Sequence, residues 1–236
     1  METARSGVLI GTMQARWIIQ VSVALTLATS VLVYIIACSL KHVSLWLPSI
    51  SDCATKAPEM YVFRFGMMVA AFLQATNVLI NYNATRGSYA FPKLTALAGA
   101  LGSFALGMLT VVSEDDDKRL HIAFTISFFA LYELYMISLS INGRHDQRLD
   151  ATSFGIKWIL AALVLVDMIL FIVLSQHWSK YTTAVALTEW VGVLGIQVFN
   201  MTIACDLGTT RLEEVTGTLY VRRRWQKLER EDSELR

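Results

Sequence analysis

Charged residues are scarce in this chain, and neither sign is in excess. Of its 236 residues 17% are charged, with 20 Lys and Arg against 19 Asp and Glu. Proteins that bind phosphate backbones carry a surplus of Lys and Arg on one face, and only the last stretch of this chain has such a surplus. We therefore expect no nucleic acid among its partners.

Cysteines are few as well, and they follow no metal-binding pattern. The chain has three, Cys38, Cys53 and Cys205, with no CxxC pair and no cluster of His and Cys at the spacing of metal ligands. This pattern predicts no metal site and no disulfide framework. Cys38 and Cys53 can form a disulfide if both face the same compartment, and two separate thiols are the alternative.

Motifs of known enzyme classes are absent too. The sequence has no GxSxG nucleophile turn, no HExxH metal site and no glycine-rich phosphate loop. It indicates no cofactor and identifies no acyl donor. Whether the chain is an enzyme stays open from its motifs.

Long hydrophobic runs, in contrast, fill most of the chain. Hydrophobic residues make up 55% of it, and six runs reach the length of about twenty residues that a helix needs to cross a bilayer. The sequence therefore predicts an all-α polytopic membrane protein, a bundle of six transmembrane helices. The expected spans are 17–40, 60–82, 92–112, 120–142, 156–176 and 183–205.

These spans divide the chain into an N-terminal segment (1–16), a transmembrane domain (17–208) with a long loop at 41–59, and a charged tail (209–236). We expect the tail to be partly helical or disordered. Lys and Arg near span ends are retained in the cytoplasm, and placing both termini there puts fourteen of them on that side against six on the other. Both termini are therefore expected to be cytoplasmic, and the loop 41–59 lumenal or extracellular.

Four charged residues stand out inside the expected spans, away from the span ends: Arg64, Glu133, Asp167 and Glu189. An ion at the bilayer centre costs about 2.5 to 3.5 kcal/mol, so each of them needs a partner or a proton. Arg64 and Glu189 lie at similar depth, which predicts an ion pair, with Asp167 as the alternative partner for Arg64. Arg64 can instead extend to the membrane interface. Glu133 has no basic partner in view and can be protonated.

Helical periodicity places several of these residues on faces that we expect to point into the bundle. The face in the sixth span consists of Glu189, Gly192, Ile196 and Asn200. The face in the second span consists of Arg64, Met68, Ala71, Ala75 and Tyr82. In the third span Gly99, Ser103 and Gly107 follow each other at four-residue spacing, which predicts a close approach between helices.

His121 and Asp52 are the candidate proton acceptors. His121 begins the fourth span beside the acidic run 114–117, and Asp52 lies in the loop 41–59. His121 is either a hydrogen-bonding residue at the interface or a base at the lumenal mouth, where it would suit chemistry on lipid acyl chains. The loop likewise has two interpretations, a segment that lies on the bilayer surface or a recognition element.

The tail contains the basic cluster Arg222, Arg223 and Arg224. Such a cluster beside a membrane can bind anionic lipid headgroups, at about 1 kcal/mol for each basic residue. Because acidic residues are interleaved with it, the alternative is a cluster that only fixes the topology.

Several short motifs resemble those of the Frag/DRAM/Sfk superfamily of six-span membrane proteins. In and after the long loop they are Leu47-Pro48-Ser49-Ile50-Ser51, Pro58 and Phe63-Arg64; in and after the last span they are Glu189-Trp190, Phe199-Asn200-Met201-Thr202 and Asp206-Leu207-Gly208. The last-span motifs and the acidic stretch before His121 are most similar to the post-GPI-attachment-to-proteins factor 2 branch. Ser51-Asp52 and Pro58-Glu59 look more like the autophagy-modulator and Sfk branches.

The resemblance implies two functions. The first is a Golgi or endoplasmic-reticulum factor in lipid remodelling of GPI anchors, an acyltransferase or an accessory protein for reacylation of the lyso-GPI form. A GPI lipid would then enter from the lumenal leaflet, Arg64 would engage its phosphate or hold Glu189, and His121 or Asp52 would accept a proton. The second is a non-enzymatic regulator of autophagy or phosphoinositides at a lysosomal or plasma membrane.

Overall fold

The computed structural model describes residues 9–85, 90–143, 151–207, 210–215 and 218–223. In these ranges lie six long helices, α1 (Ala15–Ser39), α2 (Glu59–Thr85), α3 (Pro92–Val111), α4 (Glu114–Gly143), α5 (Ala151–Ser175) and α6 (Trp178–Asp206). Each is long and apolar enough to cross a membrane, with a mean hydropathy between 1.4 and 2.7 in 18-residue windows. The chain is a multi-pass membrane protein built on a six-helix bundle, as its hydrophobic runs predict.

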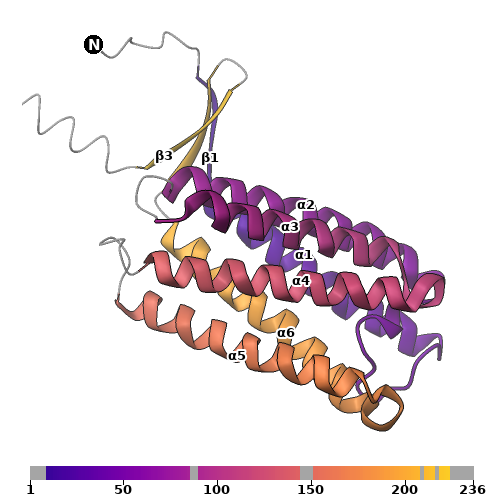
Figure 1. Ribbon diagram of the computed structural model, residues 1–236. Helices are drawn as coiled ribbons and strands as arrows, with labels where there is room; N and C mark the ends of the chain where they lie inside the picture. The colour runs from indigo at the N-terminus through magenta and orange to yellow at the C-terminus, as the bar shows by residue number, and fades with distance from the viewer. Residues whose placement is uncertain (1–8, 86–89, 144–150, 208–209, 216–217, 224–236) are drawn as a thin grey trace, which may run out of the picture.

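The helices form a ring in sequence order, in which each packs against the next and α6 packs against α1. Figure 1 shows them side by side along one long axis. The loop 40–58, which connects α1 to α2 and contains the short 3-10 helix η1 (Asp52–Ala54), lies at one end of the bundle, here called the loop end. Because the number of helices is even, the segment before α1 and the segment after α6 meet at the opposite end. These segments contain strands, and this end is here called the sheet end.

Two helices change direction near the loop end. The backbone leaves helical geometry at Asp117 in α4 (φ −156°, ψ 99°) and at Tyr181 in α6 (φ −124°, ψ 30°). The straight part of each helix begins just after its kink, close to the starts at 120 and 183 that hydropathy predicts. The few residues before each kink therefore belong to the surface of the loop end.

The prediction for the tail is wrong where the structure describes it. The strands β2 (Thr210–Val215) and β3 (Thr218–Arg223) follow α6, and β1 (Leu9–Gln14) precedes α1; they form an antiparallel sheet in the order β1-β2-β3. Thr, Val, Leu and Tyr in these segments favour strands. The partner strand β1 is supplied by the other end of the chain, which no local pattern reveals.

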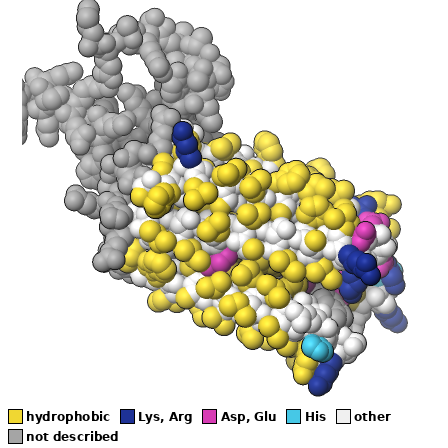
Figure 2. Space-filling view, in the orientation of Figure 1, with side chains coloured by type: hydrophobic (Ala, Val, Ile, Leu, Met, Phe, Trp, Pro, Cys, Tyr) yellow, Lys and Arg dark blue, Asp and Glu magenta, His cyan; other side chains and the backbone are white. Residues whose placement is uncertain are grey.

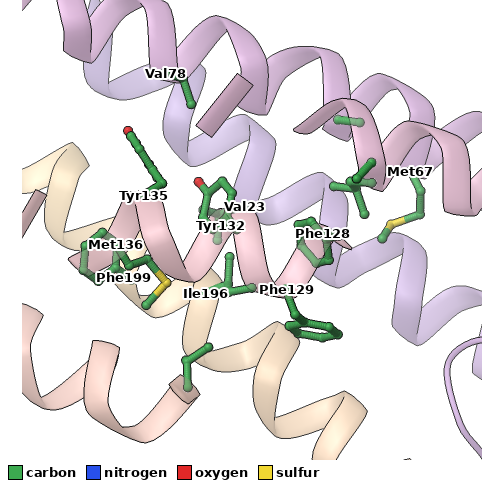
Figure 3. Close-up of a cluster of buried hydrophobic side chains, with 14 of the residues drawn as sticks. Val23, Met67, Val78, Phe128, Phe129, Tyr132, Tyr135, Met136, Ile196 and Phe199 are labelled. Atoms are coloured by element: carbon green, nitrogen blue, oxygen red, sulfur yellow. The ribbon is translucent and has the colours of Figure 1, made fainter. Parts of the chain in front are cut away.

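The bundle core is rich in aromatic side chains from α4. Figure 3 shows Phe128, Phe129, Tyr132 and Tyr135 between side chains of other helices, and all four are at most 4% exposed. The expected face of α6 is confirmed, because Glu189, Gly192, Ile196 and Asn200 are buried. The face expected in α2 is confirmed at Ala71, which is 4% exposed, but it is wrong at Met68, which is 40% exposed, whereas its neighbour Met67 is 3% exposed.

Helix α3 approaches its neighbours as its small residues predict. A Cβ atom on Gly99 would lie 2.7 Å from Val78 of α2 and 2.9 Å from Tyr135 of α4. Glycine is required at this position because any larger residue would overlap both helices.

The outer surface is that of a protein in lipid. Figure 2 shows hydrophobic side chains over the visible flank of the helices, with most of the charged side chains on this face gathered at the loop end. Large side chains such as Phe65 and Phe72 of α2 are more than 70% exposed. A bilayer would cover these positions and leave the charged end in water.

Candidate functional site

A buried carboxylate at the loop end binds the loop 40–58. Glu189 of α6 is 8% exposed, and its Oε2 accepts a hydrogen bond from the backbone N–H of Ile50 at 3.0 Å. Its Oε1 accepts a second hydrogen bond from Ser51 Oγ at 2.7 Å. Since one side chain satisfies two buried donors of the loop, it fixes the position of the loop on the bundle.

His121 of α4 contacts the same hydroxyl group. Its Nδ1 lies 2.7 Å from the carbonyl oxygen of Val112, and a carbonyl only accepts, so Nδ1 carries a proton. Its Nε2 lies 3.1 Å from Ser51 Oγ. The Ser51 hydroxyl thus connects an imidazole to the carboxylate of Glu189, an arrangement through which a proton can pass. We call Glu189, Ser51 and His121 the Glu189 cluster.

Two aromatic side chains hold the loop at further points. Tyr34 of α1 donates its hydroxyl hydrogen to the carbonyl oxygen of Leu45 at 3.0 Å, and Trp190 of α6 donates Nε1–H to that of Pro48 at 3.0 Å. The two rings meet edge to face, with centroids 6.2 Å apart. The base of the loop is closed by a hydrogen bond between His42 Nδ1 and the carboxyl group of Glu59, the first residue of α2. The loop is therefore a folded cap on the bundle.

The predicted ion pair between Arg64 and Glu189 is wrong, and so is its alternative with Asp167. Arg64 Nη2 lies 2.5 Å from Oδ2 of Asp116, at the start of α4. That oxygen also accepts hydrogen bonds from the backbone and the hydroxyl of Ser113, at 3.0 and 2.9 Å. Arg64 and Glu189 lie at similar depth in their helices, but the side chain of Arg64 extends to the end of the bundle. There it meets Asp116, which is 54% exposed.

Asp52, the other candidate proton acceptor, directly follows Ser51, but within the described residues its hydrogen bonds go to Ser49 and Thr55 and not to the Glu189 cluster. It lines a cavity of about 450 Å³ between the loop and the start of α6, which is the size of a small-ligand pocket. His42, Ser44, Trp46, Thr55 and Thr183 also line it, and none of its lining residues is Lys or Arg. The backbone of Asp52 binds Ser49 and Thr55. Among the described residues, none forms a hydrogen bond or ion pair with its carboxylate.

The remaining predicted residues lie deeper in the bundle and form no single site with the cluster. Asn200 Oδ1 accepts a hydrogen bond from the Tyr132 hydroxyl at 2.6 Å, which joins α6 to α4. Asp167 of α5 is 8% exposed and packs against Gly192 of α6. A Cβ atom on Gly192 would lie 2.8 Å from Oδ2 of Asp167. Glu133 is 2% exposed, and neither carboxyl oxygen has a partner in the described part of the chain.

The structure also locates the other candidate ligands of ions and lipids. Arg222 and Arg223 lie in β3, and Arg224 falls outside the described residues. Cys38, Cys53 and Cys205 are separate thiols. Across the ranges that the structure describes, no three His, Cys, Asp or Glu side chains are placed to share a metal ion.

Three partners at the loop end have no distinct signal as site residues in the sequence. Ser51 and Pro48 appear there only as part of the motif that carries the family resemblance, and Asp116 only as one member of an acidic run. Each gains its role from a contact with a distant helix, such as the 138 residues of sequence between Ser51 and Glu189. The signal that could reveal such contacts is the joint occurrence of two motifs, one in the loop and one in the remote helix.

The comparison with protein families matches this architecture. The model described as the Frag1/DRAM/Sfk1/Cwh43P N-terminal domain covers residues 14–210, which include all six helices. The chain belongs to this family.

Two curated Frag1/DRAM/Sfk relatives extend the match. The chain is 22% identical over 218 residues to the human DNA damage-regulated autophagy modulator protein 1, which covers 81% of this chain and 92% of that protein. It is 26% identical over 178 residues to mouse transmembrane protein 150A, which covers 73% of this chain and 66% of that protein. Neither name refers to GPI anchors. No solved structure matches the chain.

Proposed function

We propose that this chain is a membrane regulator of the autophagy-modulator type, in which the cap formed by the loop 40–58 is the recognition surface. The observation that carries the proposal is the contact of Glu189 with Ile50 and Ser51, since it turns a long loop into a fixed surface. The match to an autophagy modulator over 92% of that protein supports the same class. The excess of Lys and Arg at the sheet end favours a lumenal or extracellular cap. We include a lysosomal or plasma membrane in the proposal as the location of the chain.

The test is autophagic flux in cells that lack the chain. The degradation of long-lived proteins, measured as the part blocked by a lysosomal proton-pump inhibitor, should change in the knockout and return with the wild-type chain. Glu189→Ala, expressed at an equal level, should fail to restore it because the cap is released. Gly155→Ala is the matched control, since a Cβ there meets no atom within 4 Å. A knockout with normal flux would remove this function.

A second candidate function is lipid remodelling of GPI anchors in the Golgi or endoplasmic reticulum. It is favoured by one observation, the 3.1 Å contact between Ser51 Oγ and His121 Nε2. Nδ1–H of His121 is held by the carbonyl of Val112, so Nε2 can accept the Ser51 hydrogen once the hydroxyl turns that hydrogen from Glu189 Oε1 to Nε2. Ser51 Oγ would attack the carbonyl of a lipid ester, and His121 would take its proton and return it to the departing alcohol. A hydroxyl of the lyso-GPI lipid would then attack the acyl-serine, with His121 taking the proton of that hydroxyl and returning it to Ser51 Oγ as the acyl group leaves.

The lipid composition of GPI anchors distinguishes this function from regulation. Loss of the chain, or Ser51→Ala, should leave GPI proteins with an unremodelled acyl chain and lower their retention at the cell surface. Ser127→Ala serves as the control, because Ser127 bonds only within its own helix, to the carbonyl of Ala123. Normal anchor lipids in the knockout would exclude remodelling, whatever the effect on autophagic flux.

A further inference from the structure

The cavity between the loop 40–58 and α6 is lined by one acidic side chain and by no Lys or Arg. Asp52 is the carboxylate among its lining residues, and no Lys or Arg faces it. His42, the other ionisable residue of the lining, is already paired with Glu59. The cavity therefore offers one negative charge without a bound counterion among the described residues.

The rest of the lining suits an organic group rather than a bare ion. Trp46, 77% exposed, borders the cavity, and an aromatic face attracts ammonium groups at short range. Ser44, Thr55 and Thr183 add hydroxyl groups, while Leu47 and Pro48 add apolar surface. With a volume of about 450 Å³ the cavity is far larger than an inorganic ion.

We propose that this cavity binds a small organic cation, an ammonium or quaternary ammonium group such as choline or ethanolamine. Asp52 supplies the opposite charge, and Trp46 supplies the aromatic face. A phosphate group is disfavoured, because it would lie against a carboxylate with no basic side chain in the lining. The cation is either the headgroup of a lipid in the adjacent leaflet or a free amine. The site does not depend on which function above is correct.

Free-ligand binding tests the charge preference. The full chain in detergent micelles without choline groups would be titrated by calorimetry with choline and, separately, with inorganic phosphate. Choline should bind and phosphate should not. Asp52→Asn should weaken choline binding by about tenfold or more, and Trp46→Ala should also weaken it. Asp115→Asn and Trp17→Ala are matched controls, since both residues are exposed and neither lines the cavity.

A second experiment, with lipid bilayers, distinguishes a lipid headgroup from a free amine as the source of the cation. The chain would be placed in nanodiscs of phosphatidylcholine and phosphatidylglycerol, and the retained lipids would be counted by native mass spectrometry. Both lipids carry the same phosphodiester, so a preference for phosphatidylcholine that disappears in Asp52→Asn assigns the site to a lipid headgroup. Binding of free choline without a lipid preference assigns it to a soluble amine.

Two results would overturn the proposal. One is phosphate binding more tightly than choline; the other is equal choline binding by Asp52→Asn and Asp115→Asn. Thermal unfolding of each variant shows whether a loss of binding reflects a loss of fold. If Asp52→Asn unfolds, Asp52→Glu in its place keeps the charge and should retain choline binding.

Discussion

At the scale of single residues, the loop end depends on a few polar contacts between segments far apart in sequence, of which those of Glu189 are buried and that of Arg64 is partly exposed. Glu189 satisfies donors from Ile50 and Ser51, and Arg64 pairs with Asp116. A buried donor that loses its acceptor destabilises the fold by about 1 to 3 kcal/mol, more than a surface contact contributes. Stability measurements on these residues therefore report directly on the arrangement of the cap.

Double-mutant cycles distinguish the observed contacts from the pair that depth alone predicts. Glu189→Ala should destabilise the chain by about 1 to 3 kcal/mol, and its cycle with Ser51→Ala should give a coupling energy of about 1 kcal/mol. The cycle of Glu189→Ala with Arg64→Ala is the control. It should be additive within about 0.5 kcal/mol. Thermal unfolding in detergent measures all six chains, the wild type, three single variants and two double variants, and strong coupling between Arg64 and Glu189 would contradict the structure.

Cys53 gives a second prediction at this scale. It is 1% exposed in η1, and burial raises the pKa of its thiol to about 12. Near pH 8 the folded chain should therefore keep Cys53 as an unreactive thiol, and maleimide should label it only after unfolding. Labelling of Cys53 in a Cys38→Ser, Cys205→Ser background, read by mass spectrometry, checks this. Rapid labelling of the folded chain would contradict it.

The same pKa shift sets the sign of a pH effect on stability. Above the ordinary pKa of 9.0 the unfolded chain loses the Cys53 proton, whereas the folded chain keeps it up to about pH 12. Raising the pH through this window should therefore lower stability, by up to about 1.4 kcal/mol per pH unit from this one group. Unfolding measured from pH 8 to 10.5 should show a shallower decline in Cys53→Ala than in the wild type.

At the scale of elements, glycines decide how closely α3 approaches α2 and α4. Adding a methyl group at Gly99 brings it within 3.0 Å of side chains of both neighbours, so at least one helix has to move. Hydropathy alone places the six helices correctly, because twenty apolar residues have few alternatives to a membrane span. Hydropathy does not give the rotation of each helix about its own axis, because that rotation depends on such close contacts. For this reason part of the expected face of α2 is wrong.

Gly99→Ala should accordingly destabilise the bundle by about 1 to 3 kcal/mol. Gly155→Ala is the matched control, since the same change in α5 meets no atom within 4 Å and Ala favours a helix by up to about 1 kcal/mol. The resistance of the two purified variants to thermal unfolding measures the difference. Equal behaviour would mean that α3 is not packed as closely as described.

At the scale of the whole molecule, the loop and the sheet lie at opposite ends of one bundle (Figure 1). The sequence predicts the number of spans and, from Lys and Arg, an orientation. It does not predict the sheet or the Glu189 cluster, because both join segments that only the completed ring brings together. Ser51 and Glu189, for example, are 138 residues apart, and neither helical periodicity nor spacing relates a loop to a distant helix.

Cysteine labelling in sealed microsomes tests the orientation. In a chain whose three native cysteines are replaced by Ser or Ala, Lys56→Cys lies in the loop and Asn83→Cys near the sheet end, both at exposed positions. A membrane-impermeant maleimide should label Asn83→Cys in intact microsomes, whose outer face is cytoplasmic, and Lys56→Cys only after permeabilisation. The reverse order would invert the orientation and place the cap in the cytoplasm.

The anchoring of the first loop by the last helix has a consequence for biosynthesis. Residues 40–58 leave the ribosome early, but Glu189 and Trp190, which hold them, are synthesised about 140 residues later. Until α6 is inserted, the N–H of Ile50 and the carbonyl of Pro48 have no final partner, and a nascent chain that stalls before that point exposes an unfinished surface. The loop between the first two helices of the bundle thus reaches its final hydrogen bonds only after the sixth helix is in place.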